Sequence, residues 1–390
     1  MTIETQINSA RFFGVLFLVL APLRAFSVQD PGVTLSVSVT TNGQVQLVLT
    51  GEAGVSYVIE TSPDLQVWSA IMTNNMSSIT RVFEVDVVNS GFLRARRAPL
   101  PIFVASVAAT SSINLDGNNL QTDSFDSSDP DHSDLGAYPF NDMTEALSCG
   151  DILTGGSLSN SMGVGNARIK GILRYGPNGT IDIGPGGSVG DTAWVEGGNL
   201  GIEPGYSAND IQIFYPNPVL PSAWTPIAPI RGSFPVDGLT YDYSLTDGQW
   251  RFSNLSGGNF KIHVAGAVQI VVTSPLAMSG NDVIQIGTNA SLKIYMQGGS
   301  ATFGGKSVVN PNDSAASFGY YGLASNTNLV LTITNAFAGT VLSPGADVTI
   351  GAGTSGFSDF IGAIVARRVK LNGGVYFHFD ENLSRTGPFR

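Results

Sequence analysis

The chain has 390 residues, of which 43% are hydrophobic and 13% are charged, a balance that argues against intrinsic disorder. Its formal net charge of −11 argues against nucleic acid and anionic lipid as partners, because both attract basic surfaces. Cys149 is the single cysteine, so no intrachain disulfide can form, and we expect it to be a buried, unreactive thiol.

Residues 1–27 predict a secretory signal peptide. Arg11 precedes an apolar run at 12–23, and Ala25-Phe26-Ser27 supplies a small-x-small cleavage site. The run is shorter than the ~20 residues that cross a bilayer as a helix. We therefore expect export to the periplasm, the cell surface or the medium, with no transmembrane span after cleavage. Retention of this segment as an N-terminal anchor is the alternative.

Residues 28–98 predict a small antiparallel β-sandwich with a hairpin turn at Asn42-Gly43. The segment 54–68 reads GVSYVIETSPDLQVW, and FLRA follows at 92–95. These residues resemble the Y-x-I-E-x-S-x-D-L-x-x-W module of exported bacterial proteins, a spacer or adhesion-type unit that implies no catalytic residues. Residues 99–104 then predict a linker. The basic cluster beside it is expected to be solvated, with a docking patch for an acidic partner as the alternative, and comprises Arg94, Arg96 and Arg97.

Residues 105–390 predict a parallel β-solenoid. Short β-branched runs alternate with Gly, Asn and Pro corners, and the gaps are too short for helical crossovers. Six prolines interrupt the pattern within about 206–255, which predicts an excursion from the coil or a packed flap, since proline is excluded from central strands. The expected strands include 167–173, 180–183, 261–273, 283–286, 291–295, 329–334, 347–350 and 361–371.

Four stretches of this region carry a more specific resemblance. They read LDGNNLQTDSFDSS from 115, GNARIKG…GPNGTIDIGPGGSVGD from 165, GIEPGYSANDIQIFYP from 201 and DFIGAIVARRVKLNGGVYFHFDENL from 359. In the same order they are similar to a bacterial exported domain of unknown function found in PilX-like pilus-assembly proteins. The resemblance covers about residues 105–385. It implies a right-handed parallel β-helix associated with cell-surface or pilus machinery, and no defined activity.

An acidic loop offers the densest group of oxygen ligands. Carboxylates interleaved with serines suit Ca²⁺, although the spacing is not that of an EF-hand. The alternative is a solvated loop whose side chains cap turns. Calcium is the one cofactor we consider, and its removal would then lower thermal stability. The candidate ligands are Asp123, Asp126, Asp129, Asp131 and Asp134.

The string Phe377-His378-Phe379-Asp380 places His378 and Asp380 on one face of a strand. A histidine–carboxylate pair could orient a general base. Because no serine or cysteine nucleophile stands beside it, we expect a structural pair that closes the solenoid, and we assign no catalytic residues.

Four aromatic residues of the excursion could stack on a sugar, or could pack the flap onto the solenoid. We expect the packing role. These residues are Trp224, Tyr241, Tyr243 and Trp250.

We predict an exported, non-enzymatic structural or adhesive protein of the bacterial envelope. Its partner would be an envelope or surface component, such as a polysaccharide or a pilus protein. The alternative is a carbohydrate-active enzyme, a polysaccharide lyase or glycosidase, which would combine the carboxylates with Arg168, Lys170 and Arg174. Arg168 and Lys170 are, however, expected to line solvent. Self-assembly through the solenoid ends is a third option, unless residues 121–150 and the closing coil cover those ends.

Overall fold

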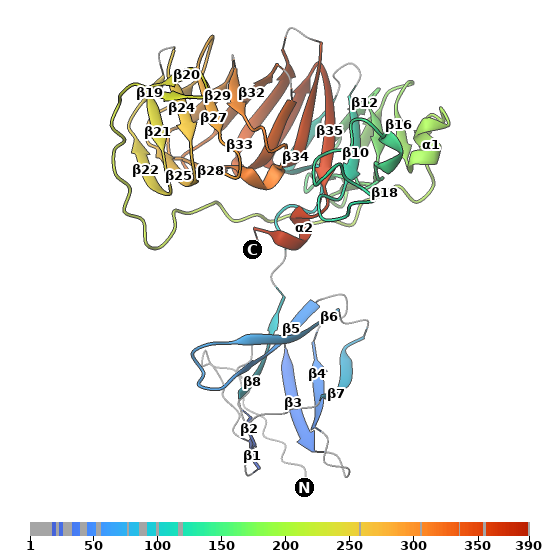
Figure 1. Cartoon of the computed structure of the whole chain (residues 1–390). Helices are drawn as coiled ribbons and strands as arrows, with labels where there is room; N and C mark the ends of the chain where they lie inside the picture. The colour runs from blue at the N-terminus through green and yellow to red at the C-terminus, as the bar shows by residue number, and fades with distance from the viewer. Residues whose placement is uncertain are drawn as a thin grey trace. The chain divides into compact units, whose positions relative to one another are not determined.

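The computed structural model describes residues 18–20, 23–25, 33–39, 45–51, 56–75, 78–85, 92–98, 101–115, 120–256, 259–304, 306–334, 336–353 and 356–388. In these residues the chain is nearly all β. It divides into two compact units, residues 1–100 and 101–390, at a point inside the predicted linker of 99–104 (Figure 1). We call the second unit the parallel-strand domain. No helix among the described residues is long and apolar enough to cross a membrane.

The N-terminal unit contains two three-stranded antiparallel sheets, ordered β3-β4-β7 and β6-β5-β8. Leu47 and Leu49 of the first sheet join Ile59 and Leu93 of the second in one apolar cluster, so the two sheets share a core. The strands are β3 (Thr34–Val39), β4 (Val45–Thr50), β5 (Ser56–Ser62), β6 (Ser69–Asn75), β7 (Thr80–Val85) and β8 (Phe92–Arg97).

Two short strands, β1 (Leu18–Leu20) and β2 (Leu23–Ala25), pair antiparallel within the segment predicted as a signal peptide. The other residues of 1–27 and the predicted turn Asn42-Gly43 lie outside the described residues. The strands on either side of that turn, β3 and β4, do pair antiparallel with each other.

The basic cluster before the linker belongs to β8, and the prediction that it is solvated is wrong for two of its members. Arg94 and Arg96 bind the buried carboxylate of Glu60 at 2.6 and 2.9 Å. Burial opposes ionisation of Glu60, yet hydrogen bonds and charges from Arg96 and Arg94 keep its pKa below the usual value. Arg94 also lies 4.2 Å from the ring centroid of Trp68, a cation–π distance. Both arginines therefore help to hold this unit together.

The parallel-strand domain is built around one 21-stranded sheet system, with a smaller parallel sheet β21-β24-β27-β30 and an antiparallel pair β19–β20. Its first half contains β9 (Val107–Asn114), β10 (Gln121–Phe125), β11 (Ile152–Thr154), β12 (Met162–Gly165), β13 (Arg168–Lys170), β14 (Leu173–Tyr175), β15 (Ile181–Ile183), β16 (Ser188–Gly190), α1 (Thr192–Glu196), β17 (Gly201–Ile202) and β18 (Ser207–Ala208).

The second half contains β19 (Phe234–Val236), β20 (Leu239–Tyr241), β21 (Tyr243–Leu245), β22 (Gly248–Phe252), β23 (Leu255–Ser256), β24 (Lys261–Val264), β25 (Ala267–Val272), β26 (Leu276–Ala277), β27 (Val283–Ile286), β28 (Ser291–Met296), β29 (Ser300–Phe303), β30 (Ser307–Val309), β31 (Phe318–Gly322), β32 (Asn328–Ile333), β33 (Ala336–Ala352), β34 (Phe357–Asn372), β35 (Gly374–Asp380) and α2 (Leu383–Thr386). Two short 3₁₀ helices lie at Met143–Glu145 and Ala315–Ser317.

Successive layers of the parallel-strand domain place like side chains above one another. Phe337 of β33 is in register with Phe360 of β34, which is in register with Phe377 of β35. The three rings stack inside the core with centroids 5.0 and 4.8 Å apart. Apolar side chains that point inward from each strand therefore form continuous columns, which is how a parallel stack buries its core without helices.

The order of strands in the stack differs from their order in the chain. β9 pairs with β34 on one side and with β11 and β12 on the other, and β10 lies between β35 and β13. The amide of Ile102 also donates to the carbonyl of Pro388 at 2.9 Å. The domain therefore begins and ends in the middle of its own stack, where the first and last strands meet. We call this boundary the seam.

Residues 209–233, between β18 and β19, connect one end of the stack to the other, and we call them the crossover segment. Near the start of this segment, the Ile211 amide donates to the carbonyl of Tyr175 in β14 at 3.3 Å. Near its end, Ile227 forms a parallel bridge with Trp250 of β22. In Figure 1 this yellow-green line runs along the stack from near β18 to β19. The predicted excursion of 206–255 is longer than the observed crossover segment. Its last part already belongs to the stack, because β21 pairs in parallel with β24.

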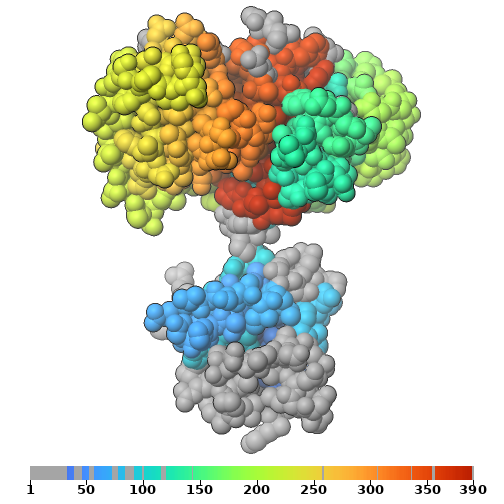
Figure 2. Space-filling view, viewed as in Figure 1, coloured from blue at the N-terminus to red at the C-terminus, as the bar shows by residue number. Residues whose placement is uncertain are grey.

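Residues 121–150 do not cover an end of the stack, contrary to the condition we set for blocked ends. They begin with β10 at the seam, and the residues after β10 pack beside the C-terminal segment, where Figure 2 shows a raised blue-green lobe against red atoms. The helix α1 packs instead on β13 and β16 of the first half.

Candidate functional site

The seam gathers the histidine and several carboxylates that the sequence singles out. Because β10 and β35 are parallel neighbours, Asp123 and His378 face each other in register. Asp123 Oδ1 lies 2.6 Å from His378 Nδ1, and Asp359 Oδ1 lies 3.1 Å from His378 Nε2. The Tyr138 hydroxyl donates to Asp123 Oδ2 at 2.7 Å, and its ring stacks on the imidazole at 3.7 Å. We call these four residues the seam cluster.

The seam cluster favours a charged imidazole. His378 is 3% exposed, and burial alone would lower its pKa, but Asp123 and Asp359 outweigh this and raise the pKa above the usual value. Burial and the charge of Asp123 likewise raise the pKa of the Tyr138 hydroxyl, which therefore remains a donor. Since both ring nitrogens contact carboxylates, neither is available to take a proton from a nucleophile.

The predicted pair of His378 with Asp380 does not form. Asp380 is in register with Phe125, two positions beyond the pair of His378 and Asp123, and its carboxylate accepts from the Ser127 amide at 3.1 Å and the Ser127 hydroxyl at 2.8 Å. Burial raises the pKa of Asp380. Asp380 and the Nδ1 atom of His378 thus contact residues from the other end of the domain, whereas the Nε2 atom of His378 contacts Asp359 of β34.

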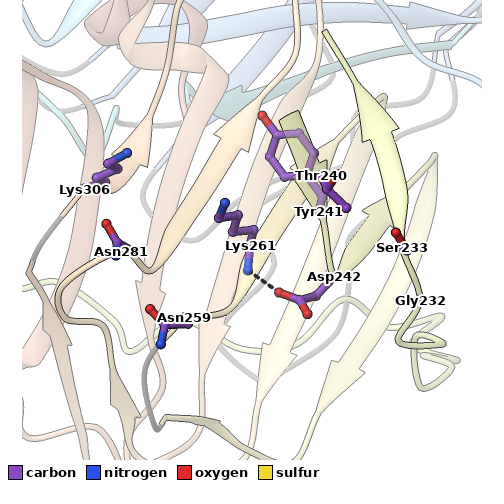
Figure 3. Close-up of a pocket in the computed structure, with 9 residues that line it drawn as sticks. All are labelled: Gly232, Ser233, Thr240, Tyr241, Asp242, Asn259, Lys261, Asn281 and Lys306. Carbon is purple, nitrogen blue, oxygen red and sulfur yellow. Dashed lines mark hydrogen bonds between the residues drawn. The ribbon is translucent and has the colours of Figure 1, made fainter. Parts of the chain in front are cut away.

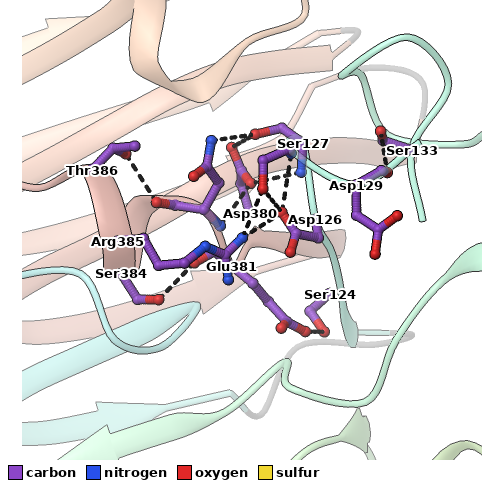
Figure 4. Close-up of polar contacts among 12 residues, drawn as sticks. Ser124, Asp126, Ser127, Asp129, Ser133, Asp380, Glu381, Ser384, Arg385 and Thr386 are labelled. Carbon is purple, nitrogen blue, oxygen red and sulfur yellow. Dashed lines mark hydrogen bonds and ion pairs between the residues drawn. The ribbon is translucent and has the colours of Figure 1, made fainter. Parts of the chain in front are cut away.

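A second set of contacts ties the loop after β10 to the last residues of the domain (Figure 4). Arg385 binds the carboxylate of Asp126 and reaches the Ser128 hydroxyl at 3.1 Å. The Ser124 hydroxyl donates to Glu381 at 2.8 Å. Burial of the Asp126 carboxylate would raise its pKa. Hydrogen bonds from Ser128 and the hydrogen bond and charge of Arg385 outweigh burial and lower the pKa below its usual value.

The five candidate calcium ligands are not brought together. Asp123 faces the imidazole and Asp126 faces Arg385, while the Asp129 carboxylate accepts the Asp131 amide at 3.0 Å. Asp131 and Asp134 are exposed, and Asp134 pairs through its backbone with Ala137. Within the described ranges no group of three or more His, Cys, Asp or Glu side chains is placed to hold a metal ion. Calcium binding stays a prediction.

Cys149 is exposed, so the prediction of a buried thiol is wrong. Desolvation of the thiol, followed by the charges of Glu381 and Asp151, nevertheless raises its pKa to about 12. The thiol is therefore protonated, and a weak nucleophile, at neutral pH. Burial also raises the pKa of Asp151 to about 6, against the hydrogen bond that its carboxylate accepts from the Ile172 amide.

The three cations assigned to the enzyme alternative are already paired. Arg168 and Lys170 contact Glu196 of α1 at 3.4 and 2.9 Å, and Arg174 binds Asp210 through two nitrogens at 3.1 and 2.8 Å. The Lys170 side chain is only 9% exposed, so the expectation that it lines solvent is wrong. None of these contacts reaches the carboxylates of the acidic loop.

The four aromatic residues of the predicted excursion lie apart from one another. Trp224 of the crossover segment packs edge-on against Tyr295 of β28, with centroids 5.4 Å apart. Tyr241 is buried, whereas Tyr243 and Trp250 are partly buried on the core. They do not form one stacking platform, and Trp224 makes the kind of packing contact that we expected.

An open groove of about 600 Å³ is lined by residues of β20 and β24 and of the turns near them, and Tyr241 is the candidate site residue from the sequence that lines it (Figure 3). Its centre holds Lys261 and Asp242, whose carboxylate accepts the Lys261 amide at 2.9 Å and binds Arg231 at 2.9 and 3.0 Å. In the sequence, Asn259 and Asn281 each stand shortly before an expected strand, and Lys306 stands just before β30. The remaining lining residues are Gly232, Ser233, Thr240 and Tyr241.

Residues 233–386 match the model of a family described as Domain of unknown function (DUF7305). The match begins beside β19, where strands resume after the crossover segment, and ends in α2. No curated protein and no solved structure matches the chain significantly.

Proposed function

We propose that this protein is an exported, non-enzymatic β-protein of the bacterial cell envelope with a structural or adhesive role. In this proposal the N-terminal unit is a small β-sandwich that acts as a spacer, and the parallel-strand domain is a right-handed β-solenoid that presents a rigid surface. The predicted signal peptide and the sequence likeness to exported PilX-like pilus-assembly proteins support the location.

The observation that carries the proposal is the use of polar groups at the seam. His378 has a carboxylate on each ring nitrogen, and Asp126 and Asp380 bind Arg385 and Ser127. All of these contacts except that of His378 with Asp359 join the first strands of the domain, or the loop after them, to its last residues. Groups that are saturated by internal partners and buried in the fold stabilise it and do not turn over substrate.

The proposal is tested by locating the protein and by assaying turnover. Fractionation of the producing bacterium should place the chain in the envelope or the medium. Purified full chain should release neither reducing ends nor unsaturated products from a panel of acidic and neutral polysaccharides. A cytoplasmic chain would contradict export.

The groove favours a polysaccharide lyase or glycosidase as the second candidate, because it places Lys261 near Asp242 on an open surface. Turnover that Lys261→Gln abolishes while the fold is retained would establish that candidate and overturn the non-enzymatic proposal.

A further inference from the structure

The groove over the smaller parallel sheet has the properties of a ligand site. Three consecutive layers each place a polar side chain along it: Asn259 before β24, Asn281 before β27 and Lys306 before β30. Neighbouring strands are about 4.8 Å apart, so these groups recur at regular intervals along one direction. A second hollow of about 240 Å³, lined largely by apolar side chains, also has Lys306 in its wall.

The charged side chains that line the groove are two lysines and one aspartate, in a protein that carries a net charge of −11. Lys261 and Lys306 both line it, and among the described residues neither ammonium group has a carboxylate within ion-pair distance. The one carboxylate in the lining, Asp242, is neutralised by Arg231. Asp282, which follows the lining residue Asn281, is fully buried, and its oxygens accept the amides of Phe260 and Ser279 at 2.8 and 2.9 Å.

We propose that this groove binds an acidic saccharide, a glycan whose sugar rings carry carboxylates. The two ammonium groups would pair with the carboxylates, because charge-assisted hydrogen bonds are the strongest polar contacts that such a surface offers. The amides of Asn259 and Asn281 can each donate to and accept from ring hydroxyls, as can the hydroxyls of Ser233 and Thr240. A small inorganic anion would pair with the lysines but would not reach the neutral donors and acceptors along the groove, whereas a saccharide can contact both.

The site accepts an extended ligand. The groove is open to solvent, and its polar groups are distributed over successive strands, as Figure 3 shows for Lys306, Asn281, Lys261 and Asp242. The inference rests on the proposed adhesive function and names the class of surface ligand that this function would use.

Isothermal titration calorimetry tests the inference: a de-esterified hexagalacturonate is titrated into the full chain at low salt, and the heat of binding is recorded. We expect saturable binding that weakens about tenfold or more in the double variant Lys261→Gln/Lys306→Gln. Lys293→Gln is the matched control, because Lys293 is an exposed lysine on β28, which belongs to the other sheet. Its affinity should equal that of the wild type. Circular dichroism of all variants confirms that they are folded.

Four results would overturn the inference. Wild-type protein could fail to bind the hexamer, the control could lose as much affinity as the double variant, or inorganic phosphate could compete as well as the acidic sugar. Binding of a fully methyl-esterified hexamer with equal affinity would overturn the acidic class. None of these results affects the location and turnover tests, so the envelope proposal and the groove inference fail separately.

Discussion

At the scale of single residues, His378 has the most demanding environment. Its imidazole is buried between Asp123 and Asp359 and stacked on Tyr138. The sequence indicates the residue types, because His378 and Asp123 both stand in conspicuous strings. Their pairing is not predictable from local pattern, since 255 positions separate them and only the register of β10 against β35 joins them.

The first prediction concerns the pH dependence of stability. Because folding raises the pKa of His378, its contribution is fully present below about pH 6.5, its ordinary pKa, and is lost as pH rises through the folded value. We expect the free energy of unfolding to fall over that range in the wild type. In His378→Gln this fall should be smaller, and below about pH 6 the variant should be less stable by roughly 3 kcal/mol.

Urea unfolding between about pH 5 and about pH 9 measures both effects. His132→Gln is the control, because that histidine lies in the acidic loop and contacts the Glu145 carbonyl through Nδ1. Parallel pH profiles for the wild type and His378→Gln would contradict the prediction.

At the scale of elements, glycine corners and close layers decide where strands begin and end. The expected strand at 261–273 is interrupted at Gly266, which separates β24 from β25. A Cβ at Gly266 would lie 2.1 Å from the Asp247 carboxylate, so the chain turns there against a neighbouring layer. The local sequence predicts one continuous strand here, because its residues are mostly β-branched. The turn at Gly266 is visible only in the fold, where Asp247 of the neighbouring layer approaches the backbone.

The second prediction concerns Gly362 in β34, which has a φ of +133°. An added Cβ would lie 2.0 Å from the carbonyl oxygen of Gly339 in β33. Both the clash and the backbone conformation oppose a side chain, so Gly362→Ala should destabilise the domain by about 3 kcal/mol or more. The control is Gly299→Ala, where the nearest atom is 4.0 Å away. Equal melting temperatures for the two variants would contradict this expectation.

At the scale of the whole domain, the crossover segment connects two halves that already meet at the seam. The N-terminal half supplies β9 and β10, and the C-terminal half supplies β34 and β35. The halves are therefore held by parallel ladders and by the seam cluster, and not by the connection alone.

The third prediction follows from this arrangement. A protease site placed at residues 218–221, near the exposed Val219, should allow the crossover segment to be cut without separating the halves. The two fragments should co-elute in size-exclusion chromatography and part only in denaturant. Fragments that separate in native buffer would show that the seam is too weak to hold the stack.

Local sequence pattern is sufficient to predict a nearly all-β chain with two units, because turn residues recur before a helix can form. It also indicates which residues carry polar chemistry. Three features are visible only in the folded chain: the parallel-strand domain begins and ends inside its stack, Asp123 is the partner of His378, and Lys261 and Lys306 share a groove. These features depend on the register between strands far apart in the chain, which is set by packing across layers and leaves no local pattern.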